Sequence, residues 1–108
     1  MDKLKTGWLT LGVLMLAASN HARAHEGSHI EDARKSRALA ATCAACHGTN
    51  GRAQGVTPVL AGKSREYLID QMKAFKSDQR QGTIMNQIAK GYDDRQMGQL
   101  ADYFADQR

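Results

Sequence analysis

The sequence predicts an all-α fold on three observations. Apolar residues recur at helical spacing in several segments, and each of these segments is preceded by a residue suited to cap a helix. No segment shows the alternation of apolar and polar residues that is typical of a half-buried strand. Large apolar side chains are few for a chain of this length, so we expect another apolar group to complete the core.

The first 24 residues have the organisation of a secretory signal peptide. Lys3 and Lys5 precede an apolar run from Gly7 to Ala18, and polar residues lead on to a small-residue cleavage site ending at Ala24. The apolar run is about a dozen residues long, whereas a membrane-spanning helix needs roughly 20. We therefore expect cleavage after Ala24, no membrane anchor in the mature chain, and a periplasmic location.

The remaining residues, 25–108, are enough for one small domain. They carry 12 basic and 10 acidic side chains, which gives a net charge of +2 with neutral histidines. This near balance gives no indication of binding to nucleic acid or to a membrane surface.

The first two helices are predicted from their caps. A capping box of Ser28 and Glu31 is expected to begin a helix that runs through an alanine-rich segment to about Ala45. Ser64 is a suitable N-cap for a second helix within residues 64–79. Its apolar residues at helical spacing are Leu68, Met72 and Phe75.

A long loop, residues 48–63, lies between the first and second helices and contains four glycines and the only proline. Two further helical segments follow the second helix. A short helical turn from Ile84 to Lys90 is expected to end at Gly91. Asp93 and Gln96 can form a capping box for the last helix. The predicted buried face of that helix consists of Met97, Leu100, Ala101 and Phe104.

Residues 42–48, TCAACHG, contain the only two cysteines, and a histidine follows the second. A thioredoxin-like dithiol would need a preceding strand, and none is predicted. A zinc site needs four ligands, and beyond Cys43, Cys46 and His47 only His25 and His29 are available. The C-x-x-C-H pattern supplies the two thiols and the iron ligand that a c-type haem requires. We therefore expect one covalently bound haem c, with His47 on the iron.

An electron-carrying haem usually has a second axial ligand, and methionine raises its potential. Met72 and Met97 lie on apolar helix stripes, where core packing is the expected role. Met85 follows a polar stretch and lies between Ile84 and Ile88, so we favour it as the distal ligand. This assignment argues against a catalytic haem such as a peroxidase, which needs an open iron position.

A histidine bound to a metal is usually oriented through its other ring nitrogen. Pro58 lies in the long loop and could offer its carbonyl to Nδ1 of His47, with Leu60 packing on the ring. From the residues alone, an ordinary turn proline is an equally good interpretation. Haem propionates could bond to tyrosine hydroxyls, although tyrosines more often only pack; the candidates are Tyr67, Tyr92 and Tyr103.

These stretches together resemble class I c-type cytochromes over essentially all of residues 25–108. The similar segments are CAACHGTNG, PVLAGKS, EYLIDQMKAFKSDQR, TIMNQIAKGY and LADYFADQ. The sequence resembles single halves of cytochrome c4-like carriers and the cytochrome subunit of flavocytochrome c sulfide dehydrogenase. TIMNQIAKGYDD is more similar to the second branch, in which many members carry two haem domains, whereas this chain has one motif.

The resemblance implies a small class I cytochrome c fold, with His47 and Met85 as axial ligands and Pro58 as the carbonyl partner of His47. It also implies that the first and last helices cross. Small residues of the first helix would then lie against aromatic residues of the last, namely Ala38 and Ala41 against Tyr103 or Phe104.

The function implied by the resemblance is one-electron transfer, with the cofactor doing the chemistry. As a subunit, the chain would receive electrons from an FAD-containing partner that oxidises sulfide. As a free carrier, it would instead shuttle between membrane complexes and soluble redox proteins. Only the first of these would make it part of an enzyme.

Overall fold

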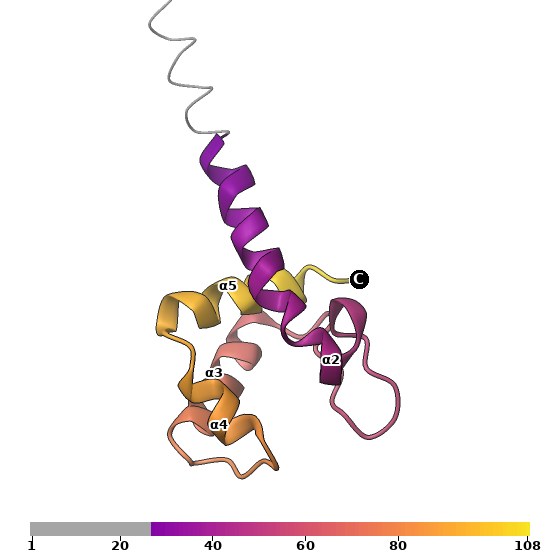
Figure 1. Ribbon diagram of the computed structural model, residues 1–108, viewed down its shortest axis with the longest axis vertical. Helices are drawn as coiled ribbons and strands as arrows, with labels where there is room; N and C mark the ends of the chain where they lie inside the picture. Colours follow the sequence, from indigo (N-terminus) through magenta and orange to yellow (C-terminus); the bar gives the residue numbers. More distant parts are fainter. Residues whose placement is uncertain (1–26) are drawn as a thin grey trace, which may run out of the picture. The chain divides into compact units, whose positions relative to one another are not determined.

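The computed structural model describes residues 27–108, so the expected signal peptide and its cleavage site lie outside the described residues. The chain divides into two compact units at Asp32, and the second unit, Ala33–Arg108, contains all the labelled helices (Figure 1). Residues 27–108 contain helices and no strand. The predicted all-α class is therefore confirmed.

The first helix covers residues 27–41. Gly27 is already helical, so Ser28 lies inside the helix and the predicted capping box at Ser28 is wrong. An N-cap residue has non-helical backbone angles, whereas Ser28 has helical residues on both sides.

The first helix also ends earlier than predicted, because the chain turns at residues 42–43, where the motif begins. The Thr42 hydroxyl donates to the Leu39 carbonyl at 2.8 Å, and the Cys43 amide donates to the Ala40 carbonyl at 3.0 Å. These bonds to the third residue back tighten the last turn. A separate helix, α2 (Ala44–His47), then carries the second half of the motif.

The next helix, α3, spans Arg65–Lys76 and is capped as predicted. The Ser64 hydroxyl accepts a hydrogen bond from the Tyr67 amide at 3.2 Å. The helix ends before residue 79 because Ser77 bonds back to a carbonyl one turn earlier and Asp78 adopts a positive φ of 59°. A left-handed residue at this position is a common way of ending a helix.

The last two helices agree with their predicted bounds. The short helix α4 spans Met85–Lys90 and ends at Gly91. The last helix, α5, spans Asp94–Ala105 and begins at the predicted capping box. Asp93 Oδ1 accepts from the Gln96 amide at 2.7 Å, and the Gln96 side chain accepts from the Asp93 amide at 3.0 Å.

The core lies where α5 meets α3 and the end of the first helix. The predicted inner face of α5 is confirmed, since each of its four residues is at most 4% exposed. α3 packs against both α4 and α5. The buried apolar residues within 27–108 are Ala40, Leu68, Ala89, Met97, Leu100, Ala101 and Phe104. Three of these are alanines, so the core of the polypeptide is small.

The helix crossing implied by the resemblance is present, but it uses a different alanine. Ala40 is 4% exposed and packs with Ala101 and Phe104, whereas Ala38 and Ala41 are exposed. Each residue along a helix turns the side chain by about 100°, so the neighbours of an inward-facing residue point elsewhere. The buried alanine of this crossing is therefore Ala40, while the exposed Ala41 lines a surface hollow together with Tyr103.

Side-chain contacts fasten α3 to the C-terminal part of the chain. Arg65 Nε donates to Asp102 Oδ1 on α5 at 2.6 Å, and Lys76 Nζ donates to the Tyr92 carbonyl at 2.5 Å. Of the helices formed by residues 27–108, none has the length and apolar character needed to cross a membrane.

Candidate functional site

The C-x-x-C-H motif is presented by a single turn of backbone. Cys43 is the N-cap residue of α2, and Cys46 and His47 end that helix. The two cysteines form no disulfide; Cys43 is half-buried and Cys46 is exposed. Burial raises the pKa of the Cys43 thiol above its ordinary value, so this thiol is uncharged at neutral pH.

His47 is the one buried polar or charged residue of the described part of the chain, and its ring is oriented by Pro58. Nδ1 lies 2.7 Å from the Pro58 carbonyl oxygen, which confirms the hydrogen bond that the resemblance implied. A carbonyl can only accept, so Nδ1 carries the proton. In the neutral imidazole this leaves the Nε2 lone pair free to bind a metal.

The loop that carries Pro58 is fastened at its base to Gly51. The Gly51 carbonyl accepts from the amides of Leu60 at 2.9 Å and Ala61 at 3.2 Å. Gly51 has a φ of 74°, and a Cβ added there would lie 2.7 Å from Cδ1 of Phe104. Only glycine allows the backbone to pass this close to α5.

Leu60 belongs to this loop and connects it to the core. It is half-buried and packs against the core cluster that includes Phe104. The leucine thus helps to hold the Pro58 segment in place. Its predicted contact with the ring stays a prediction.

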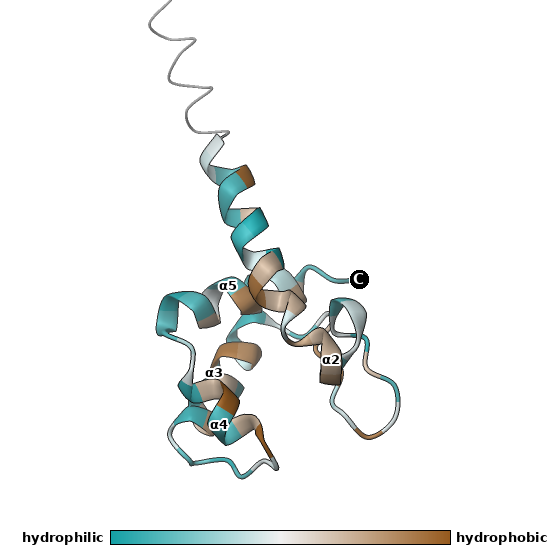
Figure 2. Ribbon diagram, in the orientation of Figure 1, coloured by the Kyte–Doolittle hydropathy of each residue, from teal (hydrophilic) through white to brown (hydrophobic). Residues whose placement is uncertain are grey.

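Met85 is the first residue of α4 and is half-buried. Its neighbours Ile84 and Ile88 are 57% and 37% exposed, and Figure 2 shows an apolar segment directly before α4. Met97 is fully buried, and Met72 packs against the core cluster. The predicted core roles of these two methionines are therefore confirmed, and Met85 remains available for another role.

Two of the three candidate tyrosines bond to other protein groups. The Tyr92 hydroxyl lies 2.9 Å from Thr42 Oγ1, and the Tyr103 hydroxyl donates to Asn50 Oδ1 at 2.7 Å. Tyr67 is 46% exposed. The sequence pattern gave no signal for the first two contacts, because each joins residues at least 50 positions apart.

The donor set fits a covalent haem better than the alternatives. A dithiol fold would need a strand, and residues 27–108 form none. Within the same residues, no three His, Cys, Asp or Glu side chains come together to hold a metal ion, and His25 lies outside them. Two free thiols beside a histidine with an available Nε2 match the requirements of a c-type haem.

A helical domain with this motif defines a c-type cytochrome, and comparison with known proteins agrees. Residues 33–107 match the family model described as Cytochrome c, and the chain belongs to the cytochrome c family. Membership of this family implies electron transfer by a covalently bound haem c. The matched range nearly coincides with the compact unit Ala33–Arg108.

The chain is similar to two kinds of bacterial cytochrome. A cytochrome subunit of sulfide dehydrogenase from Chlorobaculum tepidum is 41% identical over 66 residues, which cover 61% of this chain and 60% of that protein. Cytochrome c4 from Pseudomonas aeruginosa is 36% identical over 110 residues, covering all of this chain and 50% of the relative. The aligned residues thus cover 60% of the sulfide dehydrogenase subunit and 50% of the cytochrome c4.

A solved structure supports the fold. A cytochrome c4 from Acidithiobacillus ferrooxidans matches with a TM-score of 0.57 and 41% sequence identity, covering 58% of this chain and 37% of that chain. Together with the family match, this structure confirms the resemblance to class I c-type cytochromes.

Proposed function

We propose that this protein transfers single electrons in the periplasm through one haem c, as the cytochrome subunit of a sulfide dehydrogenase. The observation that carries the proposal is the orientation of His47. Its buried ring donates from Nδ1 to the Pro58 carbonyl at 2.7 Å, which prepares Nε2 to bind iron.

The residues of the site have separate roles in this proposal. Cys43 and Cys46 would hold the haem through thioether bonds, and His47 and Met85 would bind its iron. When bound, the haem supplies a centre that accepts and returns one electron. Met85 as a thioether ligand favours the reduced state, and the fastened loop limits movement of His47 between the two oxidation states.

The proposed electron donor is an FAD-containing partner. The partner's flavin would take the two electrons released when sulfide is oxidised to the level of elemental sulfur. This chain would then receive those electrons one at a time. The similarity to a sulfide dehydrogenase subunit supports this role, as does the small charge imbalance of residues 25–108, which offers little long-range steering of brief encounters.

The test is purification from the native organism at moderate salt. The proposal expects an FAD-containing polypeptide to co-purify with the cytochrome. It also expects sulfide to reduce the haem only when that partner is present. A cytochrome that is reduced by sulfide alone, or that never associates with a flavoprotein, would contradict the proposed partner.

The second candidate function is a free electron carrier. The similarity to a cytochrome c4 over the whole chain favours this role. A free carrier would be recovered as a separate protein and would be reduced equally well by several unrelated donors. Reduction rates that fall steeply with rising salt would also favour it, because transient redox partners are steered by charge.

A further inference from the structure

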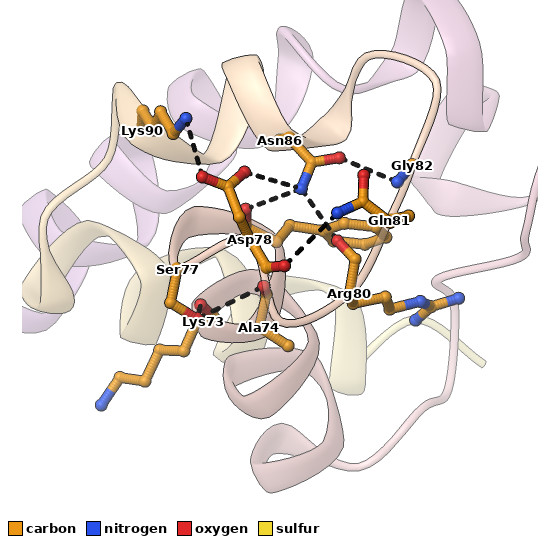
Figure 3. A network of polar contacts seen from close by, with 10 residues as sticks. Lys73, Ala74, Ser77, Asp78, Arg80, Gln81, Gly82, Asn86 and Lys90 are labelled. Carbon is orange, nitrogen blue, oxygen red and sulfur yellow. Dashed lines mark hydrogen bonds and ion pairs between the residues drawn. The ribbon is translucent and has the colours of Figure 1, made fainter.

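Asn86, in the first turn of α4, uses every hydrogen-bonding group of its side-chain amide (Figure 3). Nδ2 donates to the carbonyls of Arg80 at 2.8 Å and Phe75 at 3.0 Å, and it lies 3.2 Å from Asp78 Oδ1. Oδ1 accepts from the Gly82 amide at 2.8 Å. The amide is therefore fully satisfied, with three acceptors sharing its two N–H groups.

All four partners belong to one short segment, residues 75–82. This segment contains the last residues of α3 and most of the loop that leads to α4. Asp78 holds a second contact, because its Oδ2 accepts from Lys90 Nζ at 3.2 Å one turn further along α4. The side chains of Asn86 and Lys90 in α4 thus form hydrogen bonds with the loop that precedes the helix (Figure 3).

Packing against α3 and the side-chain bonds of Asn86 hold the start of α4 in place. Its N-cap residue, Ile84, makes no side-chain capping bond, and Ala89 is the buried residue of the helix. A helix of six residues is far too short to be stable without tertiary contacts. The position of its first residue, Met85, therefore depends on the contacts of Asn86.

We propose that Asn86 is a positioning residue that keeps Met85 in place as an iron ligand; this inference rests on the function proposed above. Asn86 acts through the backbone of α4 and the segment 75–82. An external ligand can bind the iron only if Met85 moves away. Moving the start of α4 breaks the Asn86 bonds, so these bonds oppose the replacement of Met85.

The test is a titration of the oxidised holoprotein with imidazole, followed by loss of the near-infrared sulfur-to-iron band. In Asn86→Ala, we expect half-replacement at an imidazole concentration on the order of tenfold lower, because hydrogen bonds that hold Met85 are gone. Gln87→Ala is the matched control. Gln87 is the exposed next residue, its side chain makes no hydrogen bond within residues 27–108, and its titration should equal that of the wild type.

A second variant separates positioning from general stability. Asp78→Gly removes an acceptor of Asn86 and the partner of Lys90, yet glycine suits the positive φ of 59° at this position. We expect imidazole to replace Met85 more readily in this variant, without a lower unfolding temperature. If Asn86→Ala does not fold with haem, Asp78→Gly decides the question.

Hydrogen exchange gives a readout apart from the haem. The Gly82 amide donates to Asn86, so it should exchange faster in Asn86→Ala, while amides in the middle of α5 keep their rates. Equal imidazole titrations for Asn86→Ala and Gln87→Ala would overturn the inference. Met85→Ala tests the underlying assignment: if the near-infrared band survives in that variant, the ligand proposed above is wrong, whatever Asn86 does.

Discussion

The hydroxyl of Tyr92 lies 2.9 Å from Oγ1 of Thr42, across 50 positions of sequence. Thr42 immediately precedes Cys43, and Tyr92 lies between α4 and α5. The pair therefore joins the haem-attachment motif to the segment that follows the proposed methionine ligand. The Tyr92 carbonyl also accepts from Lys76, so the tyrosine links three parts of the chain.

Tyr92→Phe should lower the free energy of unfolding by roughly 0.5–1.5 kcal/mol, the usual contribution of one hydrogen bond. The ring keeps its packing, and Thr42 still bonds to the Leu39 carbonyl at 2.8 Å, so no polar group loses all its partners. Thermal or denaturant unfolding of the holoprotein measures the change. Thr42→Val in the Tyr92→Phe background should add less than it does alone, since both changes remove the same bond.

Replacing Cys43 and Cys46 together by alanine should give protein without covalent haem. The wild-type protein should keep its haem through acid-acetone extraction, because thioether bonds survive this treatment. Absorption spectra of the polypeptide after extraction make the comparison. Wild-type protein that loses its haem, or that carries zinc or a reversible dithiol, would overturn the haem assignment.

Met85→Ala should abolish the near-infrared sulfur-to-iron band and lower the reduction potential, because thioether ligation favours ferrous iron. Met97→Ala should keep the band but lose roughly 2–5 kcal/mol of stability, since Met97 is fully buried. Met72→Ala should keep the band with a smaller loss, because this residue is half-buried. Loss of the band in either of these two variants would show that the mutated methionine, and not Met85, is the iron ligand.

Gly51→Ala should destabilise the holoprotein by about 2–4 kcal/mol, which combines left-handed strain with overpacking. The added Cβ would lie 2.7 Å from Phe104 and 2.9 Å from Leu60. Gly55→Ala is the matched control, because its φ is 86° but a Cβ there meets nothing within 4 Å. This control should lose only about 1–2 kcal/mol, so equal unfolding midpoints for the two variants would contradict the packing argument.

Local signals explain why the later helices were predictable. The caps at Ser64 and Asp93 and the apolar stripe that includes Leu100 depend on residues within one or two turns, and all three predictions are confirmed. The same kind of signal was wrong at Ser28, because the helix already extends beyond it. A capping pattern indicates a position where a helix can begin, but the helix can also begin earlier in the chain.

Contacts between distant residues were beyond the sequence pattern. Nothing near Pro58 shows that its carbonyl, and not merely its ring, has a role; the family resemblance supplied the partner, and the structure has the bond. The contacts of Tyr92 and Asn86 were missed altogether. Tyr92 joins two separate turns, whereas Asn86 joins α4 to the segment just before it. A polar residue beside a loop has no periodicity that would predict its partner.

The loop of residues 48–63 has a closed base and an open tip. The Gly51 carbonyl accepts from the amides of Leu60 and Ala61 at the base, whereas Val56 at the tip is fully exposed. The tip can therefore change in length and charge without altering how Pro58 holds His47. Evolution can remodel the surface offered to redox partners here while leaving the iron chemistry untouched, and an affinity tag inserted beside Gly55 would exploit the same separation.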